Sequence, residues 1–109
     1  MPAALHGIEM YLYSMNAVRA SDNVFLEKAI AAVADPYRMN IIRELQEKGT
    51  IRCCDVVNLT GLSQPTCSHH IRLLAESDLI ECRKEGRNNF ISLNRSSFRK
   101  LSSYFSKFA

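Results

Sequence analysis

Residues 60–77 read TGLSQPTCSHHIRLLAES, and this stretch decides the fold. A glycine-containing turn leads to Ser63, a residue type that caps helices, and to Pro65, which is tolerated within a first helical turn. Less polar side chains then recur at spacings of three and four residues, at Cys67, His70, Ile71 and Leu74. The pattern predicts a helix from Ser63 to about Ser77 with one face in the core.

The other side of this helix carries side chains that can form hydrogen bonds, namely Gln64, Ser68, His69 and Arg72, with Ser63 and Thr66 at the helix start. A short helix over residues 53–59 is predicted before the turn. Two helices joined by a tight turn form a helix-turn-helix, whose second helix enters the major groove of DNA. Such side chains are what base edges and phosphates require. A capped, solvent-exposed helix would show the same polarity, which leaves both interpretations open.

A basic hairpin follows this pair of helices. We expect a strand beginning at Leu79-Ile80, a turn over residues 85–88 and a returning strand that ends near Leu93. The polar side chains of the hairpin are mostly cations and amides: Arg83, Lys84, Arg87, Asn88 and Asn89. Such a β-wing can lie along a phosphate backbone or reach into the minor groove, and a solvated charged turn is the alternative. The order of the elements favours a winged helix-turn-helix that binds double-stranded DNA.

Helices are also predicted on both sides of this unit. Apolar residues recur at helical spacing from Leu5 to Arg19, Ser21-Asp22 caps a second helix, and Asp35-Pro36 opens a third that ends at Gly49. A last helix is expected from Ser96 to Phe108. The predicted fold is mainly α with a small β-hairpin, in the order of about α-α-α-α-α-β-β-α. A single domain over residues 1–109, with dimerisation helices at both ends, fits this length.

The charge is distributed unevenly. Residues 1–62 carry six Lys/Arg against seven Asp/Glu, whereas residues 63–109 carry eight against four, within a net charge of +3. An excess of positive charge in the C-terminal part suits contact with a polyanion. No apolar run approaches the roughly 20 residues of a membrane-spanning helix, and we expect a cytoplasmic protein without membrane contact. No catalytic pattern stands out, and we do not expect an enzyme.

Four segments together resemble the ArsR/SmtB family of bacterial repressors. They are ADPYR at 34–38, GLSQPTCSHHIRLL at 61–74, AESDLI at 75–80 and RKEGR at 83–87. The resemblance covers about Leu26 to Asn94. It implies a homodimer built from the first and last helices that binds a near-palindromic operator, and an inducer that lowers the affinity for DNA. The apolar stripe of Phe98 to Phe108 agrees with such a dimer and would equally suit an intramolecular core. A winged-helix module that binds protein instead of DNA is the alternative function.

The sensing residues depart from the family patterns. Many members sense metals through Cys-x-Cys-Asp in the helix before the recognition helix, where this chain has Arg52-Cys53-Cys54-Asp55. A cation in place of the first cysteine argues against a standard thiolate site, although a metal or arsenite site rebuilt from Cys53 and Cys54 stays open. The other common site uses Asp and His of the last helix, and residues 96–109 contain no Asp, Glu or His.

Thiol chemistry is a second hypothesis for the signal. Arg52 and a helix N-terminus beside Cys53 and Cys54 would lower a thiol pKa and favour oxidation or persulfide formation. A third interpretation is that at least one of these cysteines is a small buried hydrophobic residue. Cys67 on the core face and Cys82 in the strand are interpreted as structural. The inducer, the operator and the metal, if any, are left open by the sequence.

Overall fold

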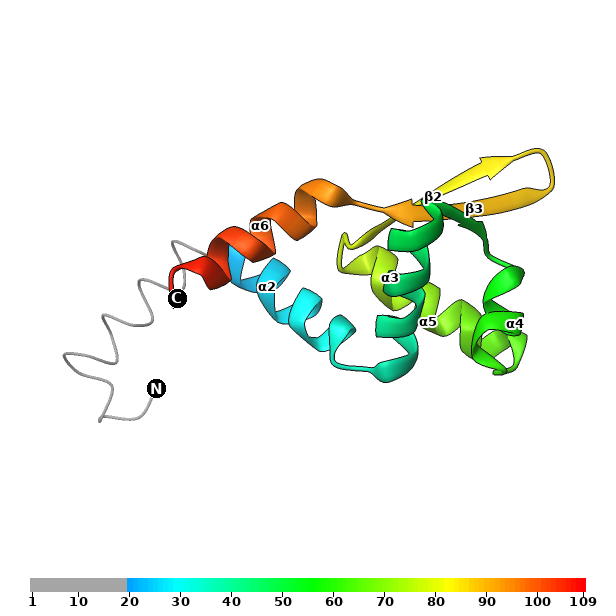
Figure 1. The fold of residues 1–109 in the computed structure, drawn as a ribbon, viewed down its shortest axis with the longest axis horizontal. Coiled ribbons are helices and arrows are strands. Elements are labelled where there is room, and N and C mark those ends of the chain that lie inside the picture. Colours follow the sequence, from blue (N-terminus) through cyan, green and yellow to red (C-terminus); the bar gives the residue numbers. More distant parts are fainter. Residues whose placement is uncertain (1–19) are drawn as a thin grey trace.

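The computed structural model describes residues 20–109, and the helix expected from Leu5 to Arg19 lies outside them. The described elements follow each other from the N-terminal to the C-terminal side as shown in Figure 1. They are α2 (Ala20–Val33), α3 (Pro36–Lys48), β1 (Thr50–Arg52), α4 (Asp55–Thr60), α5 (Gln64–Glu76), β2 (Ile80–Glu85), β3 (Asn88–Leu93) and α6 (Arg95–Ser106). The predicted mainly helical fold with a winged helix-turn-helix is confirmed.

The helix ends follow from capping chemistry. The Asp35 carboxylate accepts hydrogen bonds from the backbone N–H groups of Tyr37 (2.8 Å) and Arg38 (3.0 Å), and Pro36 takes the first helical position. Gly49, with φ +84°, ends the same helix by donating its N–H to the Leu45 carbonyl at 2.7 Å. The predicted bounds of this helix are therefore confirmed.

Four predicted boundaries are wrong. Ala20, the best helix former, already belongs to α2, which places Ser21-Asp22 inside the helix instead of at its cap. Helix α4 begins at Asp55 and not at Cys53, because the Cys53 N–H donates to the Asn89 carbonyl (2.8 Å) and residues 53–54 form a turn between β1 and the helix. Residues 50–52 form a strand that was not predicted. Helix α6 runs from Arg95, capped by Asn94, to Ser106 instead of from Ser96 to Phe108.

The three strands form an antiparallel sheet in the order β1-β3-β2. Ile91 of β3 lies opposite Ile51 of β1 and Cys82 of β2, so that buried Ile91 holds the centre of the sheet against the helices. Gly86, with φ +61°, supplies the left-handed conformation of the hairpin turn. Figure 1 shows the β2–β3 hairpin projecting beyond the helices as a wing.

One hydrophobic cluster joins the helices and the sheet of the described part. Its fully buried side chains come from every layer and include Ala29, Ile41, Leu45, Val56, Leu74, Leu79 and Ile91. The cluster holds α5 against α2 and α3 on one side and β2 on the other, which fixes the direction in which the outer face of α5 points. Within residues 20–109, no helix has the length and apolar character needed to cross a membrane.

Candidate nucleic-acid interface

Helix α5 has the two faces that its sequence predicts. The predicted core face, made of Cys67, His70, Ile71 and Leu74, is buried. The side chains predicted to contact DNA are all exposed, namely Ser63, Gln64, Thr66, Ser68, His69 and Arg72. This division leaves the outer face of α5 available to a ligand as large as a DNA duplex. The contacts of these six side chains with DNA stay a prediction.

Arg38 of α3 holds α5 in place through its guanidinium. Its Nε donates to the Ala32 carbonyl at 2.7 Å and its Nη1 donates to Nδ1 of His70 at 3.0 Å. Because a guanidinium has only donors, Nδ1 of His70 accepts and the ring carries its hydrogen on Nε2. Arg38 thereby ties the end of α2 to the buried face of α5. From the sequence, Arg38 was noted only as part of a family motif. The signal for its role was His70, because a histidine on the core face of a helix needs a polar partner.

The turn between α4 and α5 is held by Thr60. Its Oγ1 donates to the Val56 carbonyl at 2.8 Å, accepts from the Leu62 N–H at 3.2 Å, and lies 3.3 Å from Sγ of Cys67. Gly61 adopts φ +73°, the left-handed conformation that ends α4. These contacts fix the angle between the two helices from within the helix-turn-helix itself.

The six exposed side chains of α5 differ in how far their polar groups are already engaged. The hydroxyls of Ser63 and Thr66 lie 2.9 Å apart, and the Ser63 hydroxyl also caps the helix by accepting from the Thr66 N–H. Arg72 donates from Nη2 to Nδ1 of His69 at 3.0 Å, and its Nε lies 3.9 Å from a Glu76 carboxylate oxygen. Gln64 and Ser68 form no side-chain hydrogen bond with the described residues. They are therefore the polar groups that are most available to a base edge.

The wing cations are not equivalent. Successive strand residues point to opposite faces, so Arg83 and Glu85 share a face, with their Nε and Oε1 atoms 3.0 Å apart. The Arg83 guanidinium also lies 5.7 Å from the centre of the Phe90 ring. Lys84 and Arg87 are exposed and form no ion pair within residues 20–109. We therefore expect Arg87 at the tip, rather than Arg83, to dominate contact with phosphate.

A polar groove of about 220 Å³ lies between the start of α5 and the wing tip. Gln64 and Ser68 line it from the helix, and Arg87, Asn88 and Asn89 line it from the wing. The rest of its wall is formed by Arg52, Cys53, Cys54, Cys67 and Ile71. The fold thus joins the predicted reading helix and the predicted wing into one concave polar surface, which separate inspection of each motif could not establish.

Comparisons with known proteins agree with this architecture. The model of the Helix-turn-helix domain family matches residues 33–83. The chain is 33% identical over 69 residues to the arsenical resistance operon repressor of Staphylococcus xylosus, covering 63% of this chain and 65% of that protein. It is 30% identical over 87 residues to the HTH-type transcriptional regulator YceK of Bacillus subtilis, covering 79% of this chain and 87% of that protein. The chain belongs to the ArsR/SmtB family.

A solved structure has the same fold as this ArsR/SmtB family member. It is the homodimeric winged helix-turn-helix DNA-binding domain of Mb0332 from Mycobacterium bovis, with a TM-score of 0.67 at 21% identity, covering 82% of this chain and 84% of that one. The chain matches 66%, 65% and 61% of the lengths of three curated relatives, which is just under two thirds in each case. The family assignment rests on YceK, which is covered to 87%, and the solved structure shows the fold alone.

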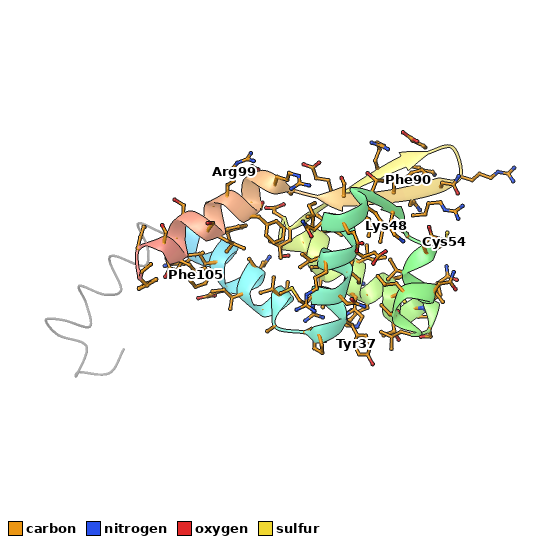
Figure 2. The ribbon with its side chains drawn as sticks, in the orientation of Figure 1. Tyr37, Lys48, Cys54, Phe90, Arg99 and Phe105 are labelled. Atoms are coloured by element: carbon orange, nitrogen blue, oxygen red, sulfur yellow. The ribbon has the colours of Figure 1, made fainter. Side chains whose placement is uncertain are left out.

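The Cys53 thiol of this ArsR/SmtB member is not activated as the sequence suggested. Arg52 binds the Asp55 carboxylate through two contacts of 3.3 Å, and its charge is not among the influences on the Cys53 thiol. Burial, together with the neighbouring thiols of Cys82 and Cys54, raises the pKa of the half-buried Cys53 thiol. The expectation of a lowered pKa is therefore wrong at Cys53. Cys54 is exposed at the edge of the polar groove, and Figure 2 shows it beside α4.

The other two cysteines occupy different environments. Cys67 is buried on the core face of α5, in agreement with a structural role. Cys82 is exposed on β2, so packing in the core does not account for it as it does for Cys67. The pKa of its thiol is raised by partial burial. Within residues 20–109, no three Cys, His, Asp or Glu side chains cluster closely enough to hold a metal ion. The metal or arsenite site rebuilt from Cys53 and Cys54 stays a prediction.

Proposed function

We propose that this protein is a sequence-specific transcriptional repressor that binds double-stranded operator DNA as a homodimer in the cytoplasm and catalyses no reaction. The observation that carries the proposal is the polar groove, where Gln64 and Ser68 of the helix-turn-helix lie beside Arg87 of the wing. In winged helix proteins the recognition helix reads base edges in the major groove while a neighbouring element contacts the backbone. The relative named as an arsenical resistance operon repressor supports the same role.

The distribution of charge supports contact with phosphates. The C-terminal part carries the excess of positive charge, and the exposed cations Lys84 and Arg87 have no acidic partner in the described part of the chain. Unpaired cations attract a polyanion without first having to break an ion pair. Arg72 is available in a different way, because its contacts with His69 and Glu76 are exposed and worth little in water.

Exposed apolar side chains support the homodimer. Phe105 in the last turn of α6 and Phe108 just after it are 50% and 75% exposed, and Val24 and Ile30 of α2 are 50% and 43% exposed. Figure 2 shows Phe105 at the end of the molecule away from the wing. Large apolar side chains clustered on one helix end mark an interaction surface. A dimer formed there would leave both wings free, in agreement with the predicted dimerisation helices.

Fluorescence anisotropy with DNA from upstream of the protein's own gene tests the function. We expect the upstream DNA to bind far more tightly than a scrambled duplex of the same length and salt concentration. Arg72→Ala should weaken operator binding by about tenfold, since a base contact is worth about 1–3 kcal/mol. Arg43→Ala is the matched control, because Arg43 is exposed on α3 outside the groove.

Two outcomes would contradict the proposed function, and a third would contradict the role of Arg72. Equal affinity for upstream and scrambled DNA would exclude a sequence-specific repressor. No binding to either duplex would favour the alternative winged-helix module that binds protein. Wild-type affinity of Arg72→Ala would show that α5 does not present Arg72 to DNA.

We further propose that thiol modification releases the operator. Cys54 is exposed in the same groove as Gln64 and Arg87, so that an adduct, an oxidised sulfur or a bound metal or arsenite there would occupy space that DNA needs. N-ethylmaleimide serves as a probe of this obstruction. We expect it to release DNA from the wild type and from Cys82→Ser, but not from Cys53→Ser/Cys54→Ser. Equal release from the double variant would show that these thiols are not the sensor.

A further inference from the structure

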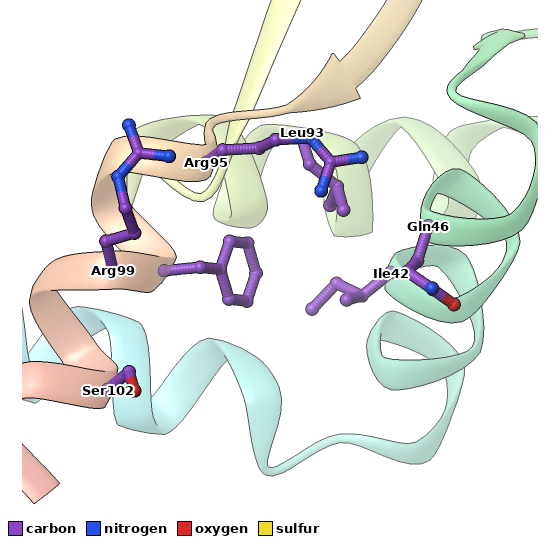
Figure 3. Close-up of a pocket in the computed structure, with 7 residues that line it drawn as sticks. Ile42, Gln46, Leu93, Arg95, Arg99 and Ser102 are labelled. Carbon is purple, nitrogen blue, oxygen red and sulfur yellow. The ribbon is translucent and has the colours of Figure 1, made fainter. Parts of the chain in front are cut away.

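A second groove, of about 390 Å³, lies between α3 and α6 and is separate from the polar groove at the wing. Its walls are apolar side chains from three elements, Ile42 of α3, Leu93 of β3 and Phe98 of α6. Figure 3 shows Ile42 pointing from α3 toward α6. Sites for small molecules have volumes of about 300–1,000 Å³ and mostly apolar walls, and this groove meets both conditions.

Two arginines form the rim of this groove. Arg95 and Arg99 are four residues apart on α6, and Phe98 and Ser102 continue the same face of the helix at helical spacing. Figure 3 shows Arg95 extending from α6 over the groove toward α3, with Arg99 one turn further along α6. Both arginines are exposed, and neither forms an ion pair or a side-chain hydrogen bond with residues 20–109. No acidic side chain lines the groove.

This arrangement favours one kind of ligand. Guanidinium groups bind carboxylates in a planar, two-bonded geometry, and the low polarity of the adjoining wall strengthens the attraction of opposite charges. The apolar wall of Ile42, Leu93 and Phe98 would bind a hydrocarbon body by removing it from water. Gln46 and Ser102 at the margin are neutral and would not repel an anion.

We propose that the groove between α3 and α6 binds a small organic carboxylate with an apolar body, of the medium-chain or aryl type. Its carboxylate binds Arg95 and Arg99, and its body packs on Ile42, Leu93 and Phe98. Another copy of α6 is a poorer occupant, because this helix carries Arg95, Arg99 and Lys100, is followed by Lys107, and has no acidic residue. The proposal deepens the proposed function by naming an effector class, and it rests on that function only for its regulatory meaning.

Isothermal titration calorimetry of the full-length protein with octanoate tests the proposal without DNA. We expect saturable binding of octanoate, and affinity about tenfold lower for 1-octanol, because a hydrogen bond to a charged group is worth about that factor. Acetate should bind weakly, since it lacks the apolar body. The double variant Arg95→Gln/Arg99→Gln should bind octanoate no better than octanol. Arg43→Gln removes one positive charge from exposed α3 outside the groove and should bind like the wild type.

Three results would overturn the proposal. The first is the absence of saturable octanoate binding, which would follow if another segment of the chain or a second copy filled the groove. The second is equal affinity for octanoate and octanol. The third is an unchanged affinity of the double variant for octanoate. Circular dichroism and thermal unfolding confirm that the variants are folded.

Nuclear magnetic resonance shows where octanoate binds. We expect its largest chemical-shift changes at the methyl groups of Ile42 and Leu93 and at the Phe98 ring. Changes confined to Phe105 and Phe108 would place octanoate on the exposed aromatic end of α6 and would overturn the assignment to the groove. Because no assay here contains DNA, failure of ligand binding is distinguishable from failure of operator binding.

Discussion

Arg38→Ala removes the side chain that connects α2, α3 and α5. The guanidinium donates at 2.7 Å to the Ala32 carbonyl and at 3.0 Å to Nδ1 of His70, while a third contact, to the Ala31 carbonyl, is long at 3.4 Å. Alanine keeps the backbone N–H that Asp35 caps, and therefore leaves the start of α3 intact. The substitution thus isolates the contribution of the guanidinium.

The expected loss follows from the two short hydrogen bonds. A hydrogen bond that involves a charged group contributes about 1.5–3 kcal/mol, and two at the lower end give about 3 kcal/mol. Arg38 is half-buried and His70 is buried, so water replaces these donors incompletely. With a urea dependence of about 1.5 kcal/mol per molar for a small protein, the midpoint of unfolding should fall by about 2 M.

Urea unfolding followed by far-ultraviolet circular dichroism measures this change. All variants are compared at one protein concentration, because dimerisation adds to apparent stability. Arg43→Ala, on the exposed side of the same helix, should unfold close to the wild-type midpoint. If Arg38→Ala unfolds at the same urea concentration as Arg43→Ala, the guanidinium does not hold α5 in place and the reasoning is wrong.

Three further predictions concern the cap, the turn and the wing. Although burial acts in the opposite direction, hydrogen bonds and the charge of Arg38 lower the pKa of Asp35. The ionised carboxylate therefore stabilises the fold at pH values above the unfolded pKa, and this stability is lost as pH falls through the folded pKa. Asp35→Ala should therefore lower the free energy of unfolding by about 1 kcal/mol at pH 7 and by less below about pH 4. Asp35→Asn keeps a neutral cap, and its free energy of unfolding should lack this pH dependence. Parallel curves of unfolding free energy against pH for the wild type and Asp35→Asn would contradict the prediction. Gly61→Ala should cost about 1–2 kcal/mol in urea unfolding, since a methyl group there meets no atom within 4 Å and only the φ of +73° opposes it; an unchanged midpoint would show that the turn relaxes. Arg87→Ala should reduce the slope of log affinity for DNA against log salt by about one unit, and Arg83→Ala by less because Glu85 already pairs with it; equal reductions would refute this ranking of the wing cations.

Elements with local signals could be predicted from the sequence, and those that depend on distant partners could not. Asp35, Pro36 and Gly49 define α3 through contacts with their own neighbours, which explains why its bounds were predicted correctly. Strand β1 has only three residues and exists because β3, about forty residues later, pairs with it. Its absence from the prediction also displaced the expected start of α4 to Cys53.

The candidate site divides in the same way. Helical spacing correctly separated the buried and exposed faces of α5, because that division depends on one helix and one core. The Arg83–Glu85 pair was within reach of the sequence, since residues two apart on a strand share a face. The raised pKa of the Cys53 thiol was not, because it depends on burial and on the neighbouring thiols of Cys82 and Cys54. Likewise, the groove between α3 and α6 arises only when distant segments pack together.

The short strand β1 also protects the protein against aggregation. Phe90, Ile91 and Leu93 make β3 the most apolar strand of the sheet, and an uncovered edge of such a strand is a template for pairing with other chains. β1 occupies one edge of β3, while the charged strand β2 covers the other and ends the sheet with Arg83, Lys84 and Glu85. The three residues of β1 thus keep β3, the most apolar strand, from lying at the edge of the sheet.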